Sequence, residues 1–163
     1  NKKRFVFLLL LLLWILFIFS HSLKPVEASN QESERVRQPL SQLVHHELSA
    51  VFVRKLAHFM EFGVLGVLAA GFFAARAGKP APLLLHSAML GMVIALCDET
   101  IQLFVAGRSG RIQDVWLDLA GALAGATLAL TLLYLARKRR SRIHNAALPH
   151  FGPSGQDSSN IEM

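Results

Sequence analysis

Four long apolar stretches dominate this chain and restrict its fold more than any other feature. The first, Phe5–Phe19, contains no charged or polar side chain. Each stretch is long enough to cross about 30 Å of hydrocarbon at about 1.5 Å per residue. A composition with 53% hydrophobic and 17% charged residues excludes a soluble globular enzyme and a disordered chain. We predict an all-α integral membrane bundle of about four transmembrane helices, with spans at about 5–23, 56–75, 83–104 and 115–136.

A cleaved signal peptide is the competing interpretation of the first span. A basic start, a 15-residue apolar run and the small-residue pattern Val26-Glu27-Ala28 are typical of such a peptide. The pattern, however, ends nine residues beyond the apolar run. This distance favours a retained transmembrane helix.

The lysine and arginine residues predict the orientation of the bundle. With four spans, both termini lie on one side of the membrane, and that side carries ten of the 17 Lys and Arg residues. Two clusters, Lys2–Arg4 and Arg137–Arg142, flank the first and fourth spans. Because basic loops stay in the cytoplasm, we expect both termini there. The net charge of +6 then reflects topology and contact with lipid headgroups, and we expect no nucleic-acid partner.

The segment between the first two spans is expected to contain an amphipathic helix on the outer surface. Apolar residues recur there at three- and four-residue spacing among polar ones: Leu40, Leu43, Val44, Leu48, Val51 and Phe52. Residues 143–163 are rich in Gly, Pro, Ser and Asn, which predicts a flexible cytoplasmic tail. The membrane domain is therefore expected over residues 1–142.

Three polar stretches stand at the ends of spans, and the predicted topology puts all three at the outer face. A charge at the centre of a span costs about 2.5–3.5 kcal/mol on insertion scales, so charges retained near this depth indicate a functional site. The stretches contribute five carboxylates, one histidine, one amide and four cations: Arg54, Lys55, His58, Glu61, Asp98, Glu99, Gln102, Arg108, Arg111, Asp114 and Asp118.

Helical spacing brings several of these side chains together. Three pairs lie one turn apart and therefore share a face: His58 and Glu61, Asp98 and Gln102, and Asp114 and Asp118. Gly121 and Gly125 continue the stripe that begins at Asp118. This small-xxx-small pattern allows close helix packing, and Gly63 and Gly66 serve similar packing in the second span. We therefore expect Asp118 near a helix interface rather than in lipid.

The three stretches, in their order along the chain, resemble the VanZ-like family. The motifs are Arg-Lys-x-x-His-Phe-x-Glu-Phe from Arg54, Asp-Glu-x-x-Gln-x-Phe from Asp98, and Gly-Arg-Ser-Gly from Gly107, followed by Asp-Val and Asp-x-x-Gly-x-x-x-Gly. The resemblance covers roughly residues 14–136, including Ser20 and Ser22. It implies a small multi-pass protein of the bacterial inner membrane. The family's founding member accompanies glycopeptide resistance and lowers susceptibility to teicoplanin.

The resemblance also implies which residues matter. The family's signature positions correspond to Arg54, Lys55, His58, Glu61, Asp98, Glu99, Gln102, Arg108, Asp114 and Gly121. Two positions depart from the pattern: Ala106 stands where many members have Pro, and Asp118 stands where many have Asn. The second departure adds a negative charge, so the electrostatics of this site differ from those of a typical member.

Three main functional hypotheses remain open. A proton or ion pathway, which intramembrane carboxylates suggest, is a weaker one, because nothing comparable lines the cytoplasmic half. In the first, the protein binds an outer-leaflet lipid-linked or anionic group such as a cell-wall precursor, or holds another envelope membrane protein. The absence of a soluble domain and the small size of the bundle favour it. The ligand-binding candidates are Arg54, Lys55, Gln102, Arg108, Arg111, Asp114 and Asp118, since guanidinium and ammonium groups clamp phosphates and carboxylates.

In the second hypothesis, the protein is a membrane enzyme that modifies an envelope lipid. His58 or Glu61 would act as acid–base groups, with Asp98 and Glu99 as further catalytic candidates. Asp98, Glu99 and Asp114 would suit a divalent metal, although the sequence specifies no cofactor. In the third, the charges form a structural ion-pair lock. Because such locks cost stability as often as they add it, a cluster this large favours a working site.

Overall fold

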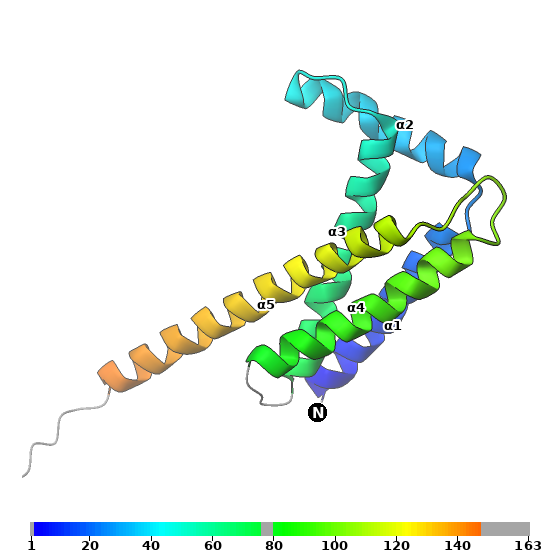
Figure 1. Cartoon of the computed structure of the whole chain (residues 1–163). Helices are drawn as coiled ribbons and strands as arrows, with labels where there is room; N and C mark the ends of the chain where they lie inside the picture. The colour runs from blue at the N-terminus through cyan, green and yellow to red at the C-terminus, as the bar shows by residue number, and fades with distance from the viewer. Residues whose placement is uncertain (1, 76–79, 148–163) are drawn as a thin grey trace, which may run out of the picture. The chain divides into compact units, whose positions relative to one another are not determined.

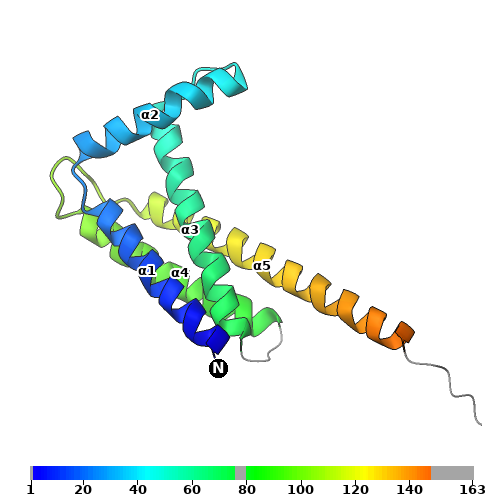
Figure 2. The same cartoon turned by 180° about the vertical axis from the view of Figure 1, so that it is seen from behind.

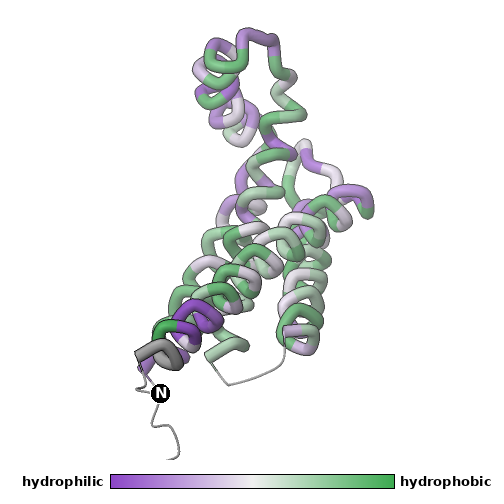
Figure 3. The backbone as a smooth tube through the Cα atoms, turned by 90° about the vertical axis from the view of Figure 1, so that its left-hand side faces the viewer, coloured by the Kyte–Doolittle hydropathy of each residue, from purple (hydrophilic) through white to green (hydrophobic). Residues whose placement is uncertain are grey.

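The computed structural model describes residues 2–75 and 80–147, which form five helices and, within these ranges, no strand. The helices are α1 (Lys2–Ser22), α2 (Val26–Val44), α3 (Ala50–Ala74), α4 (Pro80–Gln102) and α5 (Ile112–Ala147). All except α2 are long and apolar enough to cross a membrane, which confirms the predicted all-α multi-pass class. Figure 3 shows the contrast between these apolar helices and the more hydrophilic α2.

Helix α3 contacts every other helix in the unit formed by residues up to Leu132 (Figures 1 and 2). It packs against α1, α2 and α4, and its glycines meet α5. The centre of the packing is apolar, with Ile18, Phe62, Leu65, Ala95 and Ala122 almost completely buried. The remainder of α5, from Leu133, belongs to a second unit and presents an exposed basic surface at Arg137–Arg142.

Small residues set the distance between α3 and α5. A Cβ atom added to Gly66 would overlap the backbone carbonyl of Ala122, and one added to Gly125 would overlap the carbonyl of Gly63. A Cβ added to Gly121 would likewise overlap the carbonyl of Phe59. The small-xxx-small pattern therefore acts as predicted, since it brings the two backbones into contact one turn beyond Asp118.

The helix between the first two spans is present, but its predicted position is wrong in part. It starts at Val26 and ends at Val44, where His45 adopts a left-handed conformation with φ of 53°. Helix α3 then begins after Ser49, whose hydroxyl accepts a hydrogen bond from the Phe52 amide. These two helix ends interrupt the apolar periodicity, so Leu48 lies in the connection and Val51 and Phe52 belong to α3.

Each predicted span lies largely within one apolar helix, and α5 extends eleven residues beyond the predicted end of the fourth span. Most of the tail predicted at 143–163 lies outside the described residues, although α5 continues to Ala147. The division into a membrane domain of residues 1–142 and a tail stays a prediction.

Candidate functional site

Four helix ends meet at one end of the bundle and bring the three predicted polar stretches together. They are the C-terminal ends of α1 and α4 and the N-terminal ends of α3 and α5 (Figure 1). Direct contacts tie them: Ser22 bonds to Asp98, Lys55 to Asp114, and the Arg111 amide to Glu99. The up-and-down course of the apolar spans explains this meeting, because it returns alternate helix ends to the same side.

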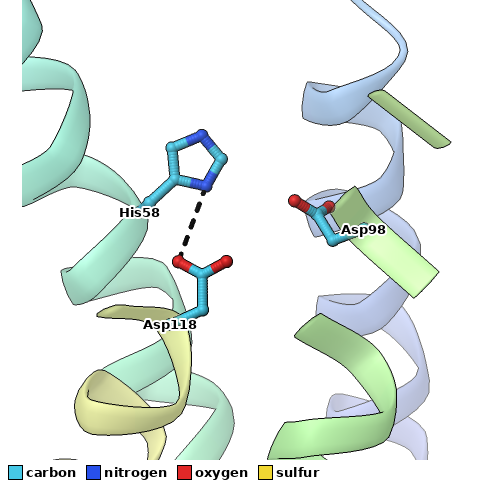
Figure 4. A group of neighbouring side chains, drawn as sticks. All are labelled: His58, Asp98 and Asp118. Atoms are coloured by element: carbon cyan, nitrogen blue, oxygen red, sulfur yellow. Dashed lines mark ion pairs between the residues drawn. The ribbon is translucent and has the colours of Figure 1, made fainter. Parts of the chain in front are cut away.

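Three side chains from three helices face a common space at this end: His58 on α3, Asp98 on α4 and Asp118 on α5 (Figure 4). Each offers one atom that could coordinate a metal, a ring nitrogen or a carboxylate oxygen, and these three atoms lie within 4.8 Å of one another. Both aspartates are fully buried. His58 Nδ1 lies 4.0 Å from Asp118 Oδ1, beyond hydrogen-bond distance, so neither of these atoms nor Asp118 Oδ2 has a partner among the described residues.

Asp98 differs from Asp118 because its carboxylate is held from two sides. The hydroxyl of Ser22, at the end of α1, donates to Oδ1, and Gln102 Nε2 donates to Oδ2 at 3.0 Å. Ser22 is fully buried, and Gln102 is 8% exposed. The expected pairing of Asp98 with Gln102 on one helix face is therefore observed, and it fixes the orientation of the Asp98 carboxylate.

The two glutamates of the cluster point to different neighbours. Glu99 accepts hydrogen bonds from Gln102 Nε2 at 3.2 Å and from the Arg111 amide at 2.7 Å, so it anchors the loop between α4 and α5. Glu61 pairs with His21 Nδ1 at 2.8 Å. Although His58 and Glu61 are one turn apart, His58 lies beside Asp118 whereas Glu61 is directed to the end of α1.

Most of the cluster's cations form no salt bridge with its carboxylates among the described residues. Lys55 bridges Asp114 at 2.7 Å, and this is the one Lys or Arg bridge to a cluster carboxylate within the described residues. The three arginines bond to neutral oxygens instead: Arg54 to Asn30 at 3.5 Å, Arg108 to the His21 carbonyl at 3.5 Å, and Arg111 to Ser109 at 3.3 Å. Burial lowers the pKa of the Arg108 guanidinium, which lies in the loop outside the spans.

Two cavities open onto the cluster. The first, which we call the basic pocket, has a volume of about 100 Å³ and is lined by all four cations together with His58 and Gln102. Two carboxylates, Glu99 and Asp114, also line it. The second, the apolar groove, has a volume of about 230 Å³ and runs between α2 and α3. Its apolar lining consists of Val36, Leu40, Val53, Leu56, Ala57 and Met60. Arg54, His58 and Arg108 line both cavities.

Sequence reasoning left three contributors from α1 out of the cluster, although the family resemblance included Ser22. His21 pairs with Glu61, and its Nε2 atom lies 3.4 Å from Glu32 Oε2. Ser22 donates to Asp98. Trp14 Nε1 donates to the Glu61 carbonyl at 2.9 Å. A signal was available, since Ser20-His21-Ser22 is a polar triplet that ends an otherwise apolar span. This triplet lies at the same end of the bundle as the charged stretches.

The structure also changes which residues suit a metal ion. The sequence grouped Asp98 with Glu99 and Asp114, but Glu99 is engaged by Gln102 and Arg111, and Asp114 is engaged by Lys55. Asp98 instead lies with His58 and Asp118. The donor set is therefore one imidazole and two carboxylates from three helices.

Comparison with known proteins gives one family. The family model VanZ/LLP1 matches residues 5–135, which contain every cluster residue named above. No curated protein and no solved structure matches the chain.

Proposed function

The chain belongs to the VanZ/LLP1 family, and we propose that this multi-pass membrane protein binds the anionic headgroup of a lipid-linked molecule at the outer leaflet. The headgroup occupies the basic pocket and an acyl or prenyl chain enters the apolar groove. In this proposal the membrane is the bacterial inner membrane, both termini are cytoplasmic, and the cell-envelope response to glycopeptides such as teicoplanin is the setting of the activity.

The observation that carries the proposal is the set of three guanidinium groups that line the basic pocket without a carboxylate partner among the described residues. Arg54, Arg108 and Arg111 each retain several N–H donors, because each makes one hydrogen bond to a neutral oxygen. Guanidinium groups suit phosphate and carboxylate ligands. A structural lock would direct these donors to the nearby carboxylates instead.

The shape of the site supports a lipid rather than a free anion. The basic pocket and the apolar groove share Arg54, His58 and Arg108, so a ligand with a charged head and an apolar chain spans both cavities. Apolar side chains from α2 and α3 line the groove, as an acyl chain requires. A cell-wall precursor carried on a lipid phosphate has this chemistry, and another envelope membrane protein is the alternative partner.

Binding of a short-chain anionic lipid to the purified protein tests the proposal. Dioctanoyl phosphatidylglycerol serves as the probe, with dioctanoyl phosphatidylcholine as the neutral comparison, and affinity is measured by thermal shift in detergent. We expect Arg108→Gln and Arg54→Gln each to weaken binding about tenfold, which is the loss of one charge-assisted hydrogen bond of about 1.5 kcal/mol. The matched control is Arg35→Gln, since Arg35 is exposed and lines neither cavity.

Equal binding of the two lipids, or equal effects of Arg35→Gln and Arg108→Gln, contradicts the proposal. The envelope role is tested separately, by the teicoplanin susceptibility of a host that expresses wild-type protein or Arg108→Gln at matched abundance. We expect the wild type to lower susceptibility and the variant to lose this effect.

One observation favours an enzyme as the second candidate. His58 lines the basic pocket, and its Nδ1 atom has no partner among the described residues, so its imidazole can exchange a proton with a bound substrate. The other proposed acid–base residue, Glu61, is engaged by His21. Turnover of a lipid probe that His58→Gln abolishes, while probe binding is retained, distinguishes the enzyme from a binding protein.

A further inference from the structure

We propose that His58, Asp98 and Asp118 form a binding site for one divalent transition-metal ion, with Zn²⁺ as the best-matched species. One imidazole nitrogen and two carboxylate oxygens supply the ligands, and they come from α3, α4 and α5 (Figure 4). Imidazole ligands select transition metals such as Zn²⁺ over Mg²⁺ and Ca²⁺, which prefer all-oxygen sites.

The burial of Asp118 without a partner in the described ranges indicates an ion site rather than a chance group of acidic residues. Its side chain is 1% exposed, both of its oxygens lack a hydrogen-bond partner among the described residues, and it points into the space shared with His58 and Asp98 (Figure 4). A buried carboxylate without partners is costly, and a charge that faces it removes the cost. No Lys or Arg in the described part of the chain lies within salt-bridge distance of Asp98 or Asp118.

The geometry is close to that of a coordinated ion. Ligand atoms about 2.1 Å from one Zn²⁺ ion lie roughly 3.4 Å apart in a tetrahedron, whereas the three candidate atoms lie within 4.8 Å of one another. Side-chain movements that bring these atoms closer by up to about 1.4 Å, the difference between 4.8 Å and 3.4 Å, close the gap. The net charge is also suitable, because two carboxylates and a neutral imidazole neutralise a divalent cation.

Ser22 and Gln102 complete the site as orienting groups. Each donates to one oxygen of Asp98, and each of those oxygens keeps a second lone pair for a metal. Hydrogen-bonded ligands of this kind are typical of metal sites, where the outer partners set the ligand orientation. This role gives the buried Ser22 hydroxyl, 76 residues away in the sequence, a specific function.

The site also retains an open side. His58 lines the basic pocket as well as the metal site, so three protein ligands leave a fourth position that a water molecule or a ligand in the pocket can occupy. Contact between the ion and a headgroup rests on the proposed function, whereas metal binding itself does not.

Metal content and affinity of the purified full chain test the proposal. The protein, without a histidine tag, is stripped with a chelator in detergent, equilibrated with Zn²⁺ and analysed by mass spectrometry for metal content. We expect one zinc ion per chain. Competition with a fluorescent chelator then gives affinities, for which we expect a loss of about 100-fold or more in Asp118→Asn and about tenfold in Ser22→Ala. Asp114→Asn is the matched control, because its carboxylate lies in the same cluster but pairs with Lys55.

Thermal unfolding separates metal binding from a structural role. Without metal, Asp118→Asn is expected to unfold at the same temperature as the wild type or higher, because the substitution removes a buried carboxyl group that has no hydrogen-bond partner among the described residues. Zinc is expected to raise the unfolding temperature of the wild type and not of Asp118→Asn. No stoichiometric zinc in the wild type, or equal zinc affinity in the wild type and Asp118→Asn, overturns the proposal. His58→Gln provides the same comparison if Asp118→Asn does not fold.

The lipid measurement distinguishes the two proposals from each other. Binding of dioctanoyl phosphatidylglycerol is repeated in the presence of the chelator. Lipid binding that persists in a protein without zinc affinity overturns the metal site alone. Zinc binding in a protein that does not discriminate between the two lipids overturns the headgroup proposal alone.

Discussion

Helices α3 and α5 face each other at two neighbouring levels along their length, a polar level and a glycine level. The two levels differ in how closely they are packed and in whether their polar groups are paired. At the first level, His58 and Asp118 approach each other with their polar atoms unpaired. At the second, about two turns further, Gly66 and Gly125 bring backbone against backbone with no room for a methyl group. The glycine level is filled and holds the helices together, whereas the polar level has unsatisfied groups and adjoining cavities. Stability and function are thus assigned to separate parts of one helix pair.

The largest expected loss of stability comes from adding a methyl group at the glycine level. Gly66→Ala is expected to destabilise the protein by about 3 kcal/mol or more, because its Cβ would overlap the Ala122 carbonyl and force the helices apart. Gly63→Ala is the matched control, since a Cβ there would meet the Gly121 carbonyl at 3.7 Å, an ordinary contact. Thermal unfolding in detergent and the yield of folded protein measure both. Similar unfolding temperatures for the two variants would show that the close backbone contact at Gly66 does not hold the two helices together.

The next largest loss of stability is expected at the polar level, and it measures how much this level stabilises the fold. Asp98→Ala, measured with a chelator present, is expected to cost about 1–3 kcal/mol, because it leaves the buried Ser22 hydroxyl without its acceptor and the Gln102 amide with Glu99 alone. Asp114→Ala is expected to cost less than about 1 kcal/mol, since its partner Lys55 is 42% exposed and the pair is screened by solvent. A larger loss in Asp114→Ala would indicate that ion pairing, rather than buried hydrogen bonding, organises this level.

The two levels also differ in how far they could be predicted from the sequence. Length and hydropathy determine the spans, and the glycine spacing in 63–66 and 121–125 indicated the close packing directly. The cost of charge in lipid likewise identified the cluster residues on α3, α4, α5 and the loop before α5, but not those on α1. Their partners could not be predicted, because contacts such as Ser22 to Asp98 depend on how α1 rotates against α4. The same limit explains why Glu99, rather than Asp118, was grouped with Asp98 at first.

A smaller effect is expected from the tryptophan that reaches the polar level from α1. Trp14→Phe is expected to cost about 1 kcal/mol, the typical value of one hydrogen bond, because it removes the bond from Nε1 to the Glu61 carbonyl. The aromatic stacking on Phe17 is retained. Trp116→Phe is the control, since Trp116 is 59% exposed to the surroundings of the bundle. Equal unfolding temperatures for Trp14→Phe and Trp116→Phe would show that Trp14 contributes through apolar packing alone.

The smallest effect lies at the edge of the polar level, where Lys24 donates to Glu32 at 2.6 Å. This hydrogen bond lowers the pKa of Glu32 below the usual 4.5. A carboxylate with a lowered pKa in the folded state stabilises the protein above its unfolded pKa, and this contribution is lost as the pH falls through the folded value. Because Glu32 is 46% exposed, the contribution is well below 1 kcal/mol. Unfolding temperatures of the wild type and Glu32→Gln between about pH 6 and pH 3 are expected to converge at the acidic end. If Glu32→Gln changed the unfolding temperature more than Asp98→Ala does, the stabilising electrostatic interactions would lie at the exposed edge rather than among the buried groups.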